Sequence, residues 1–226
     1  MILHIRGALG TQLFEYLIGA AKAKVGNTAI EEVHISTAGN IVEPCKTDWL
    51  SQIIEVPCPV KLVEQVNKQR VWTNVDNFKL INETKVIDNI ISKVPLVIND
   101  YSILHVRGKD RCIASEQDYC KIMHSIGPTV KLLGDDQLMI NNLIAICGFG
   151  ENISQDELTD WQTIRGAKQV CCAFTNFTIS SLLFRPSVDI KMLSRENSNG
   201  PVKIHPISYE CIDQLFNHIF TNATWL

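Results

Sequence analysis

The 226-residue sequence has no excess of basic residues, no long hydrophobic run and no cysteine pair at zinc-binding spacing. Its net charge of -3 argues against a general nucleic-acid binder, which needs a basic surface. The apolar runs are much shorter than the roughly 20 residues that cross a membrane, so we expect no membrane-spanning segment. With 46% hydrophobic and 20% charged residues, the chain has the composition of a globular protein with one large core or two smaller ones.

The eight cysteines do not form a recognisable disulfide or metal framework. No Cys-x-x-Cys pair occurs, and the adjacent Cys171 and Cys172 would point to opposite faces of a strand. Several cysteines lie in apolar runs, and no secretory signal is evident. We therefore predict reduced thiols, no zinc site and a cytoplasmic location.

From Tyr101 onward, apolar strands alternate with helical patterns. The pattern predicts strands at 102–104, 130–133 and 169–174, and helices at 115–125, 137–147 and 156–168. This order is typical of a parallel sheet with helices on both faces. A further strand at 202–204 and a helix at 209–220 are expected near the end of the chain.

The first hundred residues are less regular. A strand at 2–5, a glycine-containing turn and an amphipathic helix ending near Gly26 open the chain. After a strand at 32–35, short helices are expected at 48–54 and 60–66. The segment from Trp72 to Asn99 predicts one or two strands and a helix at 85–93.

The segment YSILHVRGKD, Tyr101 to Asp110, carries an expected buried strand into a cluster of polar residues. Ligands of open α/β sheets bind at the carboxyl ends of strands. An arginine there presents a fork of donors that fits phosphate oxygens, so Arg107 is a candidate anion contact. Gly108 beside it lets the backbone come close to a ligand. The alternative is a solvated charged turn.

Two other expected strands also end in polar residues. One is followed by Asp135 and Asp136. The other leads into a hydroxyl-rich loop whose candidate phosphate contacts are Thr178, Ser180 and Ser181. In a parallel sheet these groups face the same crevice as the arginine. Each also has a structural explanation, since carboxylates favour helix starts and hydroxyls cap helices.

Residues 105–110, HVRGKD, resemble the His-x-Arg-Arg-x-Asp motif of the fucosyltransferase superfamily. Residues 7–16, GALGTQLFEY, are similar to the Gly-Gly-Leu-Gly-Asn-Gln-Met/Leu-Phe-Gln-Tyr start of the α-1,2-fucosyltransferase family. Residues 133–136 are similar to its Ser-Asp-Asp segment, and residues 160–181 resemble its late helix, strand and loop. Four blocks in the right order are more specific than any one alone.

The resemblance implies a GT-B-like α/β architecture, with two Rossmann-like lobes and the donor site in the C-terminal lobe. It predicts an N-terminal acceptor-side lobe over 1–98, a nucleotide-sugar-binding lobe over 99–206 and a C-terminal helix over 207–226. The implied activity is inverting, metal-independent transfer of fucose from GDP-fucose to a glycan hydroxyl. The implied partners are this donor and a glycan acceptor, without a cofactor.

By the same resemblance, Arg107 binds the donor diphosphate and His105 lines its site. The other implied donor-site residues are Asp135, Asp136, Asp160, Thr178, Ser180 and Ser181. A fixed guanidinium and helix amides can stabilise the charge on a departing nucleotide without a metal. A base must also deprotonate the acceptor hydroxyl, and the candidates are Glu15 and Asp110.

Three departures from the family pattern leave alternatives open. Gly108 replaces the second arginine, Thr11 replaces the asparagine of the opening motif, and the chain is shorter than a usual member. A degenerate nucleotide-sugar-binding module without transferase activity would fit these departures. A different α/β enzyme, such as a nucleotide hydrolase, is a further alternative, although no Gly-x-x-x-x-Gly-Lys-Ser/Thr or Gly-x-Ser-x-Gly motif occurs.

Overall fold

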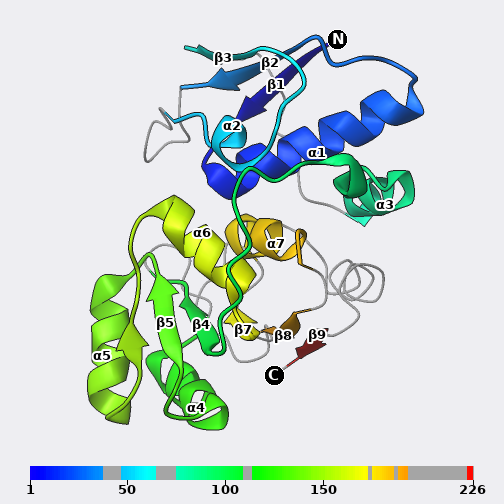
Figure 1. The fold of residues 1–226 in the computed structure, drawn as a ribbon. Coiled ribbons are helices and arrows are strands. Elements are labelled where there is room, and N and C mark those ends of the chain that lie inside the picture. Colours follow the sequence, from blue (N-terminus) through cyan, green and yellow to red (C-terminus); the bar gives the residue numbers. More distant parts are fainter. Residues whose placement is uncertain are drawn as a thin grey trace. The chain divides into compact units, whose positions relative to one another are not determined.

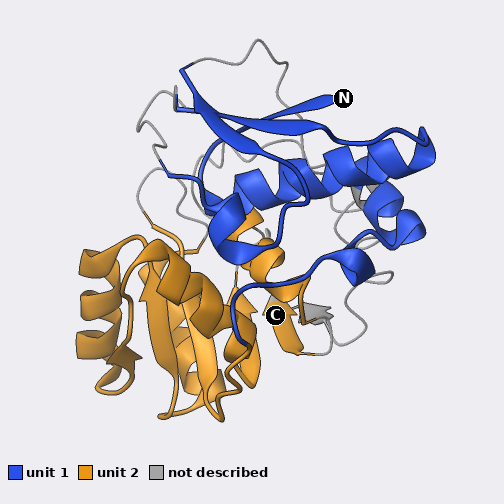
Figure 2. Cartoon of the chain, turned by 45° about the horizontal axis from the view of Figure 1, so that its top comes forward, with its two compact units in different colours: residues 1–95, 207–219 blue, residues 96–206, 220–226 orange. Residues whose placement is uncertain are grey.

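The computed structural model describes residues 1–37, 47–64, 75–108, 114–172, 175–185, 188–192 and 223–225. The chain divides into two compact units, and their described residues fall within 1–95 for the first and within 96–192 and 223–225 for the second (Figure 2). Each unit contains a parallel β-sheet with helices packed on it (Figure 1). The predicted α/β class is therefore confirmed.

The first unit is built on a three-stranded parallel sheet in the order β1 (Ile2–Arg6), β2 (Glu32–Ser36) and β3 (Val60–Val63). Helix α1 (Leu9–Val25) packs closely on β1. A Cβ atom at Gly19 would lie 2.4 Å from a methyl carbon of Leu3, so the glycine permits this approach. The described part of the unit has two further helices, α2 (Leu50–Ile53) and α3 (Val75–Thr84), both of which contact α1.

The buried side chain of Gln12 ties the start of α1 to α2. Its amide nitrogen donates to the carbonyls of Gly7 at 2.9 Å and Thr47 at 3.0 Å. Its amide oxygen accepts from the backbone N–H groups of Trp49 at 3.1 Å and Leu50 at 3.3 Å. One side chain thus satisfies four backbone groups around the buried turn, as buried polar groups require.

The second unit contains a six-stranded sheet in which every neighbouring pair is parallel. The strand order is β6 (Glu151–Asn152), β5 (Lys131–Gly134), β4 (Ser102–Val106), β7 (Gln169–Cys172), β8 (Asp189–Met192) and β9 (Ala223–Trp225). The helices in the described part of this unit are α4 (Glu116–Ile126), α5 (Gln137–Cys147), α6 (Glu157–Gly166) and α7 (Asn176–Leu182). Strand β4 lies between β5 and β7, near the middle of the sheet (Figure 1).

Successive residues of β4 face different helices. Leu104 and Val106 belong to the apolar core formed with α4 and α5. The ring of His105, which points the other way, lies 5.8 Å from the ring of Phe177 on α7. Because side chains alternate along a strand, α4 and α5 cover one face of the sheet, and α7 with its neighbour α6 covers the other.

Helices α4, α5 and α6 begin within one residue of where the sequence predicts. Ser115 forms a capping box with Asp118 at the start of α4. Asp136 and Asp156 accept hydrogen bonds as the N-caps of α5 and α6. Gly148, in the left-handed region at φ 74°, ends α5.

Several predictions for the irregular segments are wrong. Residues 60–63 form strand β3 instead of a helix, because their backbone pairs with β2. The predicted helix at 85–93 is displaced: α3 ends at Thr84, Lys85 adopts a φ of 51°, and only a 3-10 turn, Ile87–Asn89, follows. In the described part of 72–99, the predicted strands reduce to a single bridge from Ile54 to Ser92.

The short strands β6, β8 and β9 were not predicted. The predicted strand at 202–204 and helix at 209–220 lie outside the described residues. Of the predicted C-terminal helical region over 207–226, the described residues are 223–225, which form strand β9.

Candidate anion-binding site

Three of the predicted site segments follow adjacent parallel strands of the second unit. The register pairs Val106 of β4 with Gly134 of β5, and Leu104 of β4 with Cys171 of β7. The carboxyl ends of these strands therefore lie at one edge of the sheet. This edge carries Arg107 after β4, the two aspartates after β5 and helix α7 after β7.

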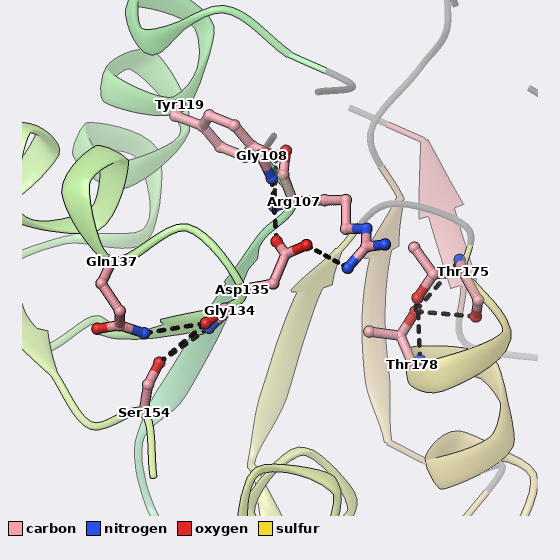
Figure 3. A network of polar contacts seen from close by, with 9 residues as sticks. All are labelled: Arg107, Gly108, Tyr119, Gly134, Asp135, Gln137, Ser154, Thr175 and Thr178. Atoms are coloured by element: carbon pink, nitrogen blue, oxygen red, sulfur yellow. Dashed lines mark hydrogen bonds and ion pairs between the residues drawn. The ribbon is translucent and has the colours of Figure 1, made fainter. Parts of the chain in front are cut away.

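Arg107 is held by a carboxylate from the neighbouring strand end (Figure 3). Its Nη1 forms an ion pair with Oδ2 of Asp135. The other carboxylate oxygen accepts the backbone N–H of Gly108 at 3.1 Å. The two charged side chains are 23% and 27% exposed, so the pair is shielded from water on most sides. Asp135 thus fixes both the guanidinium and the backbone that follows it.

The loops after β4 and β5 approach each other too closely for a side chain at position 108. A Cβ atom on Gly108 would lie 2.3 Å from the Cβ of Asp136. A Cβ atom on Gly134 would lie 1.9 Å from the carbonyl oxygen of Val106. Position 108 therefore has no room for a side chain while Asp136 keeps its place.

A buried tyrosine from α4 holds the backbone of Arg107. The hydroxyl of Tyr119 accepts the Arg107 N–H at 3.0 Å and lies 3.3 Å from the Arg107 carbonyl oxygen, to which it donates. The sequence pattern placed Tyr119 on the apolar face of this helix but did not identify it as a site residue. The available signal was its hydroxyl, since a buried tyrosine O–H usually has a polar partner.

His105 lies two residues before the arginine and on the α7 face of the sheet. Burial, with a smaller effect from the charge of Arg107, lowers the pKa of His105 to about 3. The imidazole is therefore neutral near pH 7. Its Nδ1 atom and the Nε atom of Arg107 are both buried, and neither has a hydrogen-bond partner in the described parts of the chain.

The predicted hydroxyl-rich loop is helical from Asn176 onward, which corrects the sequence interpretation. Thr178 forms a capping box with Thr175 (Figure 3). Ser180 Oγ donates to the Phe177 carbonyl at 2.8 Å and accepts the Trp161 indole N–H at 3.0 Å.

Ser181 Oγ likewise donates to the Thr178 carbonyl, at 2.7 Å. Thr178, Ser180 and Ser181 are fully buried. Their hydroxyls stabilise α7 and its contact with α6, and their contact with phosphate stays a prediction.

The remaining predicted aspartates of this unit support loops. Asp136 Oδ1 accepts the Met139 N–H at 3.0 Å as the N-cap of α5. Asp160 Oδ1 accepts the Gln155 N–H at 2.8 Å, and burial raises the pKa of its carboxyl. Their contacts with guanosine stay predictions.

Neither candidate base is among the described residues of the second unit. Glu15 lies in the first unit, where its buried carboxylate accepts the Arg6 N–H at 3.0 Å. Asp110, like Lys109, lies outside the described residues. Within the described ranges, no group of three or more potential metal ligands occurs, and no helix has the length and hydrophobicity to cross a membrane.

Comparison with known proteins gives little further guidance. No protein family matches the chain, and no curated protein matches it significantly. Similar solved structures include that of E. coli heptosyltransferase WaaC with ADP-2-deoxy-2-fluoro heptose, at 12% sequence identity and a TM-score of 0.38. The match covers 99% of this chain and 65% of that chain. A likeness at this level carries no functional conclusion.

Proposed function

We propose that the chain is a nucleotide-sugar-dependent glycosyltransferase whose second unit binds the donor diphosphate at Arg107. The observation that supports this most directly is the pair of buried nitrogens without partners among the described residues, Arg107 Nε and His105 Nδ1. Buried polar nitrogens are costly to leave unpaired, and a ligand in the site would satisfy them. A guanidinium beside a neutral imidazole suits a phosphate next to a hydroxyl-bearing sugar.

The finer proposal is GDP-fucose as donor, with a GT-B-like arrangement of the two units. It is supported by the resemblance of residues 105–110 to the fucosyltransferase motif. In the reaction, an acceptor hydroxyl oxygen bonds to the anomeric carbon as the bond to the diphosphate breaks. The bonding electrons leave with GDP, and a base takes the hydroxyl proton. Arg107 stabilises the charge that develops on the leaving diphosphate; Glu15 and Asp110 are the candidate bases.

A nucleotide-sugar-binding module without transferase activity is the second candidate. The observation that favours it is the close contact between Gly108 and Asp136, which leaves no room for the second arginine of the family motif. A transferase would release GDP from GDP-fucose in the presence of a glycan acceptor. A binding module would hold GDP-fucose without turnover.

The test is calorimetric titration with GDP, UDP and ADP in EDTA, on the parent protein, Arg107→Ala and a control. Lys121→Ala is a matched control because it removes one positive charge from a 69% exposed side chain on α4. A lost charge-assisted contact is worth about 1.5 to 3 kcal/mol, or roughly ten- to hundred-fold in affinity. We expect this loss for GDP in Arg107→Ala and none in Lys121→Ala. Nucleotide binding that is equal in Arg107→Ala and the parent would refute the site.

A further inference from the structure

Arg107 occupies the position where β4 stops being hydrogen-bonded to its neighbours. The last paired residue of the strand is Val106, opposite Gly134. Beyond it, backbone groups must find partners outside the sheet or be left unpaired. The hydroxyl of Tyr119 contacts both backbone polar groups of Arg107, at 3.0 Å for the N–H and 3.3 Å for the carbonyl oxygen.

The tyrosine is itself firmly placed. Its side chain is fully buried in the core that β4 shares with α4 and α5. Helix α4 is fixed at its start by the Ser115 capping box, and Tyr119 lies one turn further on. The hydroxyl therefore reaches the end of β4 from a capped and packed helix, on the face of the sheet opposite α7.

Arg107 is thus held at two points. Tyr119 holds its backbone, and Asp135 holds its guanidinium and the next N–H (Figure 3). The side chain is directed from this fixed backbone toward the edge of the sheet. Recognition of a diphosphate by a guanidinium fork depends on orientation as well as charge, so the support of the backbone matters.

We infer that Tyr119 is a positioning residue for anion binding, whose hydroxyl sets the direction in which Arg107 leaves the sheet. This inference rests on the proposed function, because the anion is the donor diphosphate. It adds a residue that none of the four family-like blocks contains. The side chain acts through Arg107 and does not itself touch the ligand.

The test uses Tyr119→Phe, which removes the hydroxyl and keeps the ring in the core. Binding of GDP and of guanosine is measured for the parent, Tyr119→Phe, Arg107→Ala and the double variant. Loss of the hydroxyl's support is expected to weaken GDP binding about three- to ten-fold, with guanosine binding unchanged. In the Arg107→Ala background, Tyr119→Phe should cause no further loss, because the two residues act through the same contact.

A matched control separates positioning from stability. Ile140→Val removes one methylene from the same buried core, on α5, without changing a hydrogen bond of Arg107. Its midpoint of unfolding should fall, as we also expect for Tyr119→Phe, while its GDP affinity stays within about two-fold of the parent because the phosphate contact is intact. If Ile140→Val weakens GDP binding as much as Tyr119→Phe, the effect is one of stability and the inference is overturned.

The remaining outcomes distinguish the inference from the proposed function. The inference is overturned, and the function stands, if GDP binds to the parent and depends on Arg107 but Tyr119→Phe binds it equally well. The inference is also overturned, and the function stands, if Tyr119→Phe weakens the binding of guanosine and of GDP equally. A further loss of GDP binding in the double variant, relative to Arg107→Ala, has the same meaning. If the parent binds no nucleoside diphosphate, the proposed function fails and the inference fails with it.

Discussion

Replacing Gly108 by alanine tests the packing that shapes the candidate site. The new Cβ atom would lie 2.3 Å from the Cβ of Asp136 and 2.4 Å from its Oδ2. These distances are far below van der Waals contact, so Asp136 must move. Gly108 is buried, and Asp136 starts α5, so neither loop can relax freely into solvent.

The expected loss of stability has two parts. Overpacking a buried contact costs about 1 to 3 kcal/mol. Displacing Asp136 also breaks its N-cap hydrogen bond to Met139, at 3.0 Å, and losing an N-cap costs about 1 kcal/mol. We therefore expect Gly108→Ala to lower the free energy of unfolding by about 2 to 4 kcal/mol.

Urea denaturation followed by circular dichroism measures this change. With a slope of about 2 to 3 kcal/mol/M, the midpoint should fall by roughly 1 M. Asp136→Gly is then combined with Gly108→Ala in a double variant, because it removes the clashing side chain. Glycine is still an acceptable N-cap, and this replacement costs only about a few tenths of a kcal/mol of stability. The double variant should therefore be more stable than Gly108→Ala alone.

Two results would refute this reasoning. One is a Gly108→Ala protein as stable as the parent, which would mean that the loops are not in close contact. The other is a double variant no more stable than Gly108→Ala, which would mean that Asp136 is not the obstructing group. Rescue by Asp136→Gly, in contrast, would identify the Asp136 side chain as the obstructing group.

Two further predictions concern buried polar side chains. Gln12→Ala leaves four backbone groups of the first unit without their partner, and should lower the free energy of unfolding by about 3 kcal/mol in urea denaturation. The control Gln52→Ala removes one exposed hydrogen bond and should change the free energy of unfolding by less than about 0.5 kcal/mol. His105 has a folded-state pKa of about 3, below its ordinary 6.5, so the unfolded chain binds a proton that the folded chain does not, and stability falls as pH drops from 6.5 toward 3. By pH 5 this loss in the free energy of unfolding is about 2 kcal/mol. It should be absent when unfolding of His105→Gln is measured against pH, and present for the exposed His124→Gln. Equal pH profiles of stability for His105→Gln and the parent would contradict the burial of a neutral imidazole.

Local sequence signals determined the framework of the second unit. Apolar runs at strand length and apolar faces at helical spacing depend on neighbouring residues, and they predicted β4, β5, β7 and helices α4 to α6. The end of a buried strand is also a local feature, so the position of Arg107 at the edge of the sheet could be predicted. The same signals failed for β3, because a four-residue stretch with two adjacent exposed residues lacks the alternating pattern and becomes a strand only through pairing with β2.

Only the tertiary structure decided what holds the arginine and what the other polar residues do. Asp135 lies 28 residues from Arg107 and Tyr119 lies 12 residues from it, and sheet register and helix packing bring them together. The sequence predicted that Ser180 and Ser181 lie in a loop. In the structure they lie in the buried helix α7, and their hydroxyls donate to backbone carbonyls of the same helix. The sequence determines which chemical groups exist at each strand end; their partners depend on contacts between distant segments, which no local pattern encodes.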